Sequence, residues 1–326
     1  MEMMQRQPVT PTVHTTIAVT GGTGFVGSHL LELLLQLPNV KVRLLSRKKP
    51  NFKFETKNLE VIIGDLSDKV ALSELLTHGS TLINLAYSNA SSPDLNLANA
   101  KVLAKACALA GVAKVLLCST AAVFGSSGVR VINEEIACAP SSVYGLTKLQ
   151  IEETFSYFSK NTYQLFILRP TQVFGLGGLA LTKFVNEIRH GNAFLQYGRE
   201  CLYGARRLNL VTVTTLVDAI IFVLSNEKVV PGIYVVAQDQ WPENNYRYVA
   251  DNVYSATGKS KKIPRVHLPV KLLQALLWLL GREEYETYRE YSNSKLLGAG
   301  FVNEESFPQA LNLFISELLI QSKAED

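Results

Sequence analysis

The stretch Thr15-Thr16-Ile17-Ala18-Val19-Thr20-Gly21-Gly22-Thr23-Gly24-Phe25-Val26-Gly27 is the most informative local pattern in this chain. Its first six residues form a β-branched run that predicts a strand, the glycines predict a tight turn, and the apolar residues 28–35 predict a helix. Glycines let the backbone approach a ligand closely, and a helix start presents free N–H groups, so this arrangement predicts a pyrophosphate cradle. The register is either Gly21-x-x-Gly24-x-x-Gly27 or Gly22-x-Gly24-x-x-Gly27, and a plain structural turn is the alternative interpretation.

Tyr144 and Lys148 are four residues apart in a segment with a helical pattern, so their side chains share one helix face. An ammonium group beside a phenol lowers the phenol's pKa from its ordinary value of about 10. The pair therefore predicts a proton donor or acceptor that works near neutral pH. An ordinary pair on a helix surface is the alternative.

Short β-branched segments alternate with helical ones along the first half of the chain. Strands are predicted at residues 41–45, 59–63, 81–85, 112–118 and 163–168, and helices at residues 69–76, 95–110 and 144–158. This alternation predicts an α/β fold with a Rossmann-type, doubly wound parallel sheet. After Gly175, five glycines are expected to break the chain into short elements: Gly177, Gly178, Gly191, Gly198 and Gly204.

The expected organisation is a flexible leader over residues 1–14, an NAD(P)-binding domain over residues 15–175, and a smaller substrate domain over residues 176–326. Part of residues 176–326 can add to the parallel sheet of the NAD(P)-binding domain. The most apolar stretch, residues 268–280, is too short to cross a bilayer and is expected to pack on its own domain or on a partner subunit.

Composition excludes several classes of protein. The 326 residues include 32 basic and 28 acidic side chains without long blocks of like charge, so no nucleic-acid-binding surface is expected. The four cysteines lack metal-ligand spacing, which predicts reduced thiols, no metal site and a cytoplasmic protein. No apolar run is long enough for a membrane span.

Six landmarks follow one another along the chain. They are the glycine turn, Gly64-Asp65-Leu66, Asn84-Leu85-Ala86, Cys118-Ser119-Thr120-Ala121-Ala122-Val123-Phe124-Gly125, Tyr144-Gly145-Leu146-Thr147-Lys148, and Leu168-Arg169-Pro170-Thr171-Gln172-Val173-Phe174-Gly175. In this order they resemble the extended short-chain dehydrogenase/reductase superfamily, and within it the NAD-dependent epimerase/dehydratase family. The resemblance runs from about residue 15 to about residue 318 and weakens after Gly175.

The resemblance implies a set of catalytic residues. Tyr144 would be the general acid/base, and Lys148 would lower its pKa and reach the nicotinamide ribose. Thr120 matches the family's catalytic Ser or Thr and would bond the substrate oxygen, whereas neighbouring Ser119 points to the opposite side of an extended strand. A threonine buried in a strand is the alternative for Thr120. Asn96 matches an Asn that supports a proton relay or the geometry of the site; a helix-start residue bonding backbone is the alternative.

The resemblance also implies the cofactor site. Ser46 and Arg47 end the second predicted strand, where an acidic residue would bond the ribose of NAD; this favours NADP, with NAD possible and a surface Arg as the alternative. Asp65 and Leu66 would flank the adenine. The full predicted cofactor set is Gly21, Gly24, Phe25, Val26, Gly27, Arg47, Asp65, Leu66, Leu85, Ala86, Tyr144, Lys148, Pro170 and Val173.

The predicted function is that of an NAD(P)-dependent oxidoreductase or epimerase acting on a nucleotide-activated sugar, by C4 epimerisation or 4-keto reduction. Dehydration is not expected, because Ala121-Ala122 replaces the Asp-Glu pair of the family's dehydratases. Arg207 lies one position from the family's diphosphate-binding Arg and is the candidate substrate contact, a surface arginine being the alternative.

Two other functions stay open. One is an NADP-dependent reductase or dehydrogenase of a small alcohol or ketone, similar to dihydroflavonol reductases or hydroxysteroid dehydrogenases. The other is a non-catalytic NADP-binding protein. A homodimer is expected because extended family members pair through the helices that correspond here to residues 95–110 and 144–158.

Overall fold

The computed structural model describes residues 15–52, 57–125, 128–204, 206–258 and 288–325. The predicted leader at residues 1–14 and the apolar stretch at residues 268–280 lie outside these ranges. The described residues pack into two compact units. The first holds those up to 119 together with 143–168 and 217–233, and the second holds 120–142, 169–216 and those from 234 onward. Residues 120–142 and 169–175 therefore group with the second unit, and residues 217–233 group with the first.

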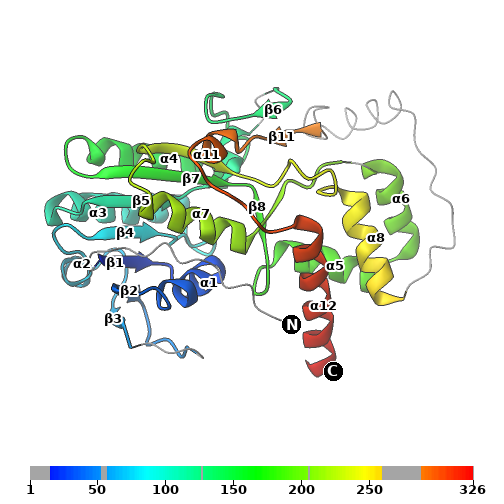
Figure 1. Ribbon diagram of the computed structural model, residues 1–326, viewed down its shortest axis with the longest axis horizontal. Coiled ribbons are helices and arrows are strands. Elements are labelled where there is room, and N and C mark those ends of the chain that lie inside the picture. Colours follow the sequence, from blue (N-terminus) through cyan, green and yellow to red (C-terminus); the bar gives the residue numbers. More distant parts are fainter. Residues whose placement is uncertain (1–14, 53–56, 126–127, 205, 259–287, 326) are drawn as a thin grey trace. The chain divides into compact units, whose positions relative to one another are not determined.

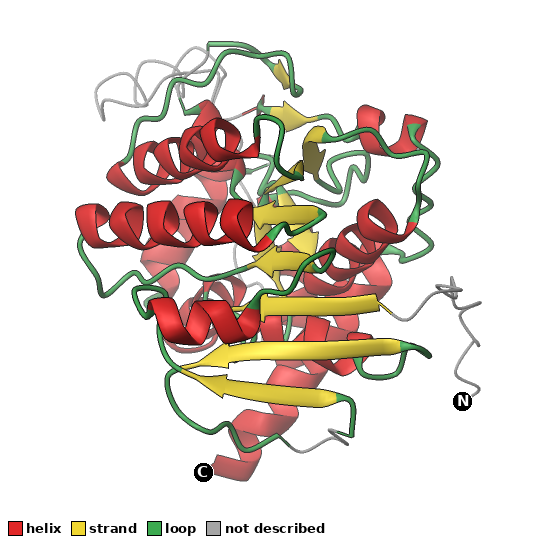
Figure 2. Ribbon diagram, turned by 90° about the vertical axis from the view of Figure 1, so that its left-hand side faces the viewer, coloured by secondary structure: helices red, strands yellow, loops and turns green. Residues whose placement is uncertain are grey.

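A seven-stranded parallel sheet has the strand order β10-β7-β5-β4-β1-β2-β3. Figure 2 shows its strands side by side with helices packed along them. The strands are β1 (Thr15–Thr20), β2 (Val40–Ser46), β3 (Leu59–Ile63), β4 (Thr81–Asn84), β5 (Lys114–Cys118), β7 (Gln164–Pro170) and β10 (Gly232–Val236). The order runs 3-2-1-4-5 from one edge and reverses between β1 and β4, which is the Rossmann arrangement. The predicted fold class is therefore confirmed.

The remaining described elements are helices and short strands, most of them labelled in Figure 1. The helices are α1 (Phe25–Leu34), α2 (Lys69–Leu75), α3 (Pro93–Ala110), the 3-10 helix η1 (Ala121–Phe124), α4 (Val143–Ser159), α5 (Ala180–His190), α6 (Ala193–Tyr203), α7 (Val213–Ser225), α8 (Tyr246–Thr257), α11 (Ser294–Gly298) and α12 (Phe307–Glu325). The short strands are β6 (Val131–Ile132), β8 (Gln172–Phe174), β9 (Leu210–Thr212) and β11 (Glu290–Tyr291).

Alternating side chains give the sheet of the first unit two apolar faces. Ala18 and Leu45 join a buried cluster with residues of α2, α3 and α4. Their neighbours Val19 and Leu44 lie beside Leu31 of α1, at the other face. Helices therefore cover both faces, as expected where successive side chains of a buried parallel strand point in opposite directions.

The core of the second unit combines aliphatic side chains with several aromatic ones. Phe174 packs edge-on against Phe307 and Phe314, at centroid distances of 5.8 and 5.7 Å. Its strand pairs join segments far apart in the chain, β8 with β9 and β11 with β6. The expectation that Gly198 breaks the chain is wrong, because Gly198 lies inside α6, where it is exposed and a Cβ would meet no atom within 4 Å.

Over the part of the chain that the structure describes, no helix has both the length and the apolar character needed to cross a membrane.

Candidate functional site

The glycine turn joins β1 to α1, and two of its glycines are required by close backbone contacts. Gly21 has φ of +75°, and a Cβ there would lie 2.7 Å from the backbone of Leu85 and Ala86. A Cβ on Gly27 would lie 2.2 Å from the carbonyl oxygen of Gly21. A Cβ on Gly22 would instead meet side-chain atoms of Leu44, Leu31 and Val19. Backbone contacts tolerate an added Cβ least, so the geometry favours the register Gly21-x-x-Gly24-x-x-Gly27.

The start of α1 is suited to an anion. Gly24 is its N-cap and provides no side-chain acceptor for the first-turn N–H groups. Phe25 and Val26 are the first two helical residues, so their N–H groups are among those without an intrahelical acceptor. The positive end of the helix dipole reinforces this, and the described residues fit the pyrophosphate of a dinucleotide.

The carboxyl ends of β1 and β4 are joined by Asn84, a residue that sequence reasoning did not place in the site. Thr20 Oγ1 donates to Asn84 Oδ1 at 2.7 Å, and the Ala86 N–H donates to the same oxygen at 3.2 Å. The Leu85 N–H donates to the Thr20 carbonyl oxygen at 3.0 Å. Asn84 thereby fixes the segment that faces Gly21.

Arg47 and Asp65 follow the ends of β2 and β3. Arg47 is exposed, while the Ser46 hydroxyl donates to the Lys48 carbonyl oxygen at 2.6 Å. Asp65 accepts hydrogen bonds from the Ser67 hydroxyl and N–H. These bonds are the main cause that lowers its pKa, and the charge of Arg47 adds to them. Arg47 therefore lies close enough to Asp65, the residue predicted to flank the adenine, to lower the pKa of its carboxyl group. Leu66 is partly buried against the core.

Tyr144 and Lys148 share one face of α4, as predicted from their spacing. Tyr144 is 38% exposed, whereas Lys148 is 6% exposed and its Nζ donates to the Cys118 carbonyl oxygen at 2.9 Å. Burial lowers the pKa of Lys148, and the neighbouring Cys118 and Glu152 oppose that shift. Both side chains lie against the ring of Tyr87, the residue that follows Ala86.

Ser119 and Glu152 form a buried pair that sequence reasoning missed. The Ser119 hydroxyl, at the end of β5, donates to the Glu152 carboxylate of α4. Both residues are less than 5% exposed. The spacing of Tyr144, Lys148 and Glu152 at intervals of four is the signal that could have revealed this carboxylate, since i and i+4 residues share a helix face.

Asn96 lies in the first turns of α3 and is buried. Its Nδ2 donates to the carbonyl oxygens of Ser88 and Ser92, and its Oδ1 accepts from the Ser88 N–H. The amide therefore bonds backbone, which matches the alternative interpretation of this residue and holds the loop between β4 and α3.

Four predicted residues belong to the second unit. Thr120 is half-buried, and its Oγ1 accepts from the Ala122 N–H at 3.2 Å, so it caps η1. Pro170 is buried at the end of β7, and Val173 is half-buried in β8. Arg207 Nη1 donates to the Trp241 carbonyl oxygen at 2.7 Å.

The second unit also buries two charged residues that the sequence did not single out. Asp239 accepts hydrogen bonds from Asn209, Asn244 and the Tyr291 N–H, and burial raises its pKa to about 6. Arg289 donates to the Gly125 carbonyl oxygen, while its Nε and Nη2 are buried without a hydrogen-bond partner among the described residues. No local sequence pattern marks either residue, because their surroundings come from distant segments.

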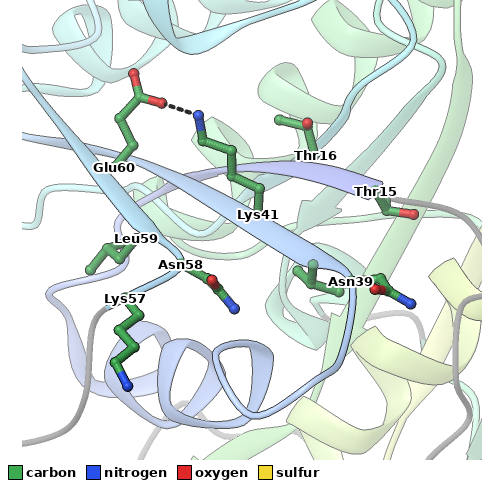
Figure 3. A pocket seen from close by; sticks show the side chains of 9 residues that line it. Thr15, Thr16, Asn39, Lys41, Lys57, Asn58, Leu59 and Glu60 are labelled. Atoms are coloured by element: carbon green, nitrogen blue, oxygen red, sulfur yellow. Dashed lines mark ion pairs between the residues drawn. The ribbon is translucent and has the colours of Figure 1, made fainter.

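A pocket of about 740 Å³ lies at the amino ends of β1, β2 and β3, where Lys41 and Glu60 form an ion pair at 2.8 Å (Figure 3). Ligands of open parallel sheets bind at the carboxyl ends of the strands, where the glycine turn and Asn84 lie. We therefore assign the candidate cofactor site to the carboxyl ends and give this pocket no role in it.

The sequence matches a known protein family. The model of the NAD dependent epimerase/dehydratase family matches residues 17–237. The chain is 24% identical to N-acetyl-alpha-D-glucosaminyl-diphospho-ditrans,octacis-undecaprenol 4-epimerase of Escherichia coli O157:H7, over 96% of this chain and 98% of that protein. It is 32% identical to UDP-glucose 4-epimerase of Azospirillum brasilense, over 42% of each chain.

Solved structures share the fold. UDP-glucuronic acid 4-epimerase of Bacillus cereus, in complex with NAD, superposes with a TM-score of 0.73 at 19% identity, covering 95% of this chain and 98% of that one. dTDP-glucose 4,6-dehydratase of Bacillus anthracis, in complex with NAD, gives a TM-score of 0.71 at 19% identity over the same shares.

The seven-stranded parallel sheet and the glycine turn define a Rossmann-type dinucleotide-binding fold. The family match places the chain further: it belongs to the NAD-dependent epimerase/dehydratase family of enzymes.

Proposed function

We propose that this protein is an NAD(P)-dependent enzyme that acts at C4 of a nucleotide-activated sugar, by epimerisation or by reduction of a 4-keto group. The observation that carries the proposal is the Tyr144–Lys148 pair: a partly exposed phenol and a buried ammonium that share one face of α4. The name of the UDP-glucose 4-epimerase relative supports the substrate class. The relative that matches nearly the whole chain is named for an N-acetylglucosaminyl-diphospho-undecaprenol, in which a polyprenol and not a nucleoside carries the diphosphate, and it supports only action at C4 of a diphosphate-linked sugar.

The cofactor would be held by the glycine turn and the start of α1 at its pyrophosphate. Arg47, Asp65 and Leu66 would lie toward its adenosine half, and Leu85, Ala86, Pro170 and Val173 would line the rest. When bound, NAD(P) supplies the acceptor and donor for the hydride at C4 of the sugar.

Tyr144 would exchange the proton. During oxidation of the sugar, the phenolate oxygen takes the proton of the C4 hydroxyl as the hydride leaves C4; during reduction it returns a proton to the carbonyl oxygen. Lys148 stabilises the phenolate by its charge. The Thr120 hydroxyl would bond the same substrate oxygen and orient it. Asn96 would act by holding the Ser88 loop.

The preferred cofactor would be NADP. Ser46-Arg47 at the end of β2 offers a guanidinium to a 2′-phosphate and no carboxylate to the ribose hydroxyls. The two related structures described above contain NAD, so a preference for NADP would distinguish this chain from them. Arg207 would contact the diphosphate after exchanging its bond to the Trp241 carbonyl oxygen.

Calorimetric titration tests the substrate class. The protein saturated with NADP, and separately with NAD, is titrated with UDP, dTDP, GDP and CDP. Micromolar binding of one diphosphate is expected, because a nucleotide-sugar enzyme must hold the nucleotide. Binding of none would favour the small alcohol or ketone reductase.

The role of Tyr144 is tested by Tyr144→Phe. This variant should lose turnover of the sugar of the preferred nucleotide and keep its cofactor affinity. Unchanged turnover would contradict the assigned role, and loss of cofactor binding would mean that the change disturbs the site as a whole.

A further inference from the structure

Tyr87 occupies a rigid position next to the candidate cofactor site. It lies between Ala86, whose N–H donates to Asn84 at 3.2 Å, and Ser88, whose N–H and carbonyl oxygen both bond Asn96 at 3.1 and 2.9 Å. Asn84 and Asn96 are both buried. The backbone on each side of Tyr87 is therefore held by a buried amide, and its ring is aimed by a fixed framework.

The Tyr87 ring contacts both members of the proposed proton-transfer pair. Its centroid lies 5.1 Å from that of Tyr144, with the rings at 84° to each other, which is an edge-to-face contact. The Lys148 Nζ lies 4.9 Å from the same Tyr87 centroid, within the range of a cation–π interaction.

Lys148 needs such a contact because it is buried. An ammonium taken out of water tends to lose its proton, and burial indeed lowers the pKa of Lys148. The groups that oppose this loss are the neighbouring Cys118, whose carbonyl oxygen on β5 accepts from the Lys148 Nζ, the Glu152 carboxylate on α4 and the Tyr87 ring. The phenol of Tyr87 is a further titratable group near Lys148, and the Tyr144 phenol lies on the same helix face. Only a protonated Lys148 can stabilise the Tyr144 phenolate.

We propose that Tyr87 is a positioning residue of the site: its ring fixes the Tyr144 phenol by edge-to-face packing and keeps the Lys148 ammonium charged through its π face. The inference rests on the proposed roles of Tyr144 and Lys148. A bare apolar side chain at position 87 could fill the space but could not stabilise the charge. No strand or helix pattern marks Tyr87, which follows the predicted strand at residues 81–85.

The test measures ionisation of Tyr144 without requiring turnover. Ultraviolet titration of tyrosinate is recorded for each protein and for the same protein carrying Tyr144→Phe, and the difference isolates Tyr144. Tyr87→Leu should raise the midpoint of Tyr144 by about half a pH unit or more, since the charged partner is weakened. Tyr87→Phe keeps both ring contacts and should leave the midpoint within about 0.2 units.

A second set of variants keeps the test valid if Tyr87→Leu fails to fold. Fluorinated phenylalanine at position 87 keeps the ring's shape but weakens its negative face, so the midpoint should rise progressively with the number of fluorines. An unchanged midpoint in both Tyr87→Leu and the fluorinated series would overturn the proposal. A shift in Tyr87→Phe as large as that in Tyr87→Leu would overturn it too, because the hydroxyl would then be the active group.

Kinetics provide a separate readout once a substrate is found. Tyr87→Leu should lower kcat about tenfold while KM changes little, because the loss falls on proton transfer. Failure to find any sugar substrate would defeat the proposed function, yet the titration would still decide the role of Tyr87. A rise in KM of about tenfold with unchanged kcat in Tyr87→Leu would contradict the positioning role.

Discussion

At the scale of single residues, Gly27 shows why the cofactor turn admits so few side chains. A Cβ there would lie within 2.5 Å of Gly22 Cα as well as 2.2 Å from the Gly21 carbonyl oxygen, and neither backbone group can move alone. Gly27→Ala should therefore destabilise the protein by about 1–3 kcal/mol and weaken dinucleotide binding. Urea unfolding and calorimetric titration with NADP and NAD check both effects.

The matched control is Gly198→Ala, in an exposed helical position with open space around the new methyl group. This change should stabilise the protein by about 0.5–1 kcal/mol, since alanine loses less backbone entropy in a helix. If Gly27→Ala were equally benign, the close-packed turn described here would not exist in solution.

Arg47 carries the predicted cofactor preference. Arg47→Asp should weaken NADP binding at least about tenfold, because a bond from guanidinium to phosphate is lost and a repulsion is added, and should improve NAD binding. Lys49→Asp makes the same charge change at another exposed position and should alter both affinities little. Equal losses in the two variants would show that only the general charge of the region matters.

At the scale of elements, α3 and α4 pack side by side and leave large apolar side chains in water. Leu109 is 79% exposed on α3 and Tyr157 is 69% exposed on α4. Leu146 is also exposed and lies eleven residues before Tyr157, close to three helical turns, so the two share one side of α4. Such a face is typical of a surface that a partner covers.

We expect this face to form a homodimer. The double change Leu109→Glu with Tyr157→Glu should convert the protein to a monomer in sedimentation velocity, because each dimer would bury four unpaired carboxylates. Ile320→Glu introduces a carboxylate at an exposed position of α12 and should leave the dimer intact. A wild-type protein that sediments as a monomer would exclude the dimer.

At the scale of the whole molecule, stability should depend on pH through Asp239. Its carboxyl group has a pKa of about 6 in the folded protein against an ordinary value of 3.8, so between these values the folded state binds more protons than the unfolded state. The free energy of unfolding should therefore fall as the pH rises through this window, by about 3 kcal/mol in total.

Asp239→Asn removes this titration. The unfolding free energy of the wild type minus that of the variant should decrease from about pH 4 to about pH 7, as measured by urea unfolding at several pH values. A difference that stays constant over this range would show that Asp239 keeps an ordinary pKa.

Local rules made much of the first unit predictable. The strands at residues 15–20 and 59–63 have the predicted bounds, because a β-branched run between turn residues leaves few alternatives. The strand predicted at residues 112–118 begins instead at Lys114, since the N–H groups of Val112 and Ala113 bond the Cys107 and Ser80 carbonyl oxygens outside the ladder. Tertiary hydrogen bonds thus set an end that propensity could not.

By itself, the sequence determined the glycine turn, the parallel α/β sheet and the helical spacing of Tyr144 and Lys148. Each of these depends on residues a few positions apart, whose conformations follow from local sterics and side-chain period. Only the tertiary structure decided that Tyr87 packs on that pair, that Ser119 bonds Glu152, and that Asp239 is enclosed by two asparagines. These contacts join segments separated by 30 residues or more in most cases, and no local pattern specifies which distant side chains meet when the chain buries its apolar surface.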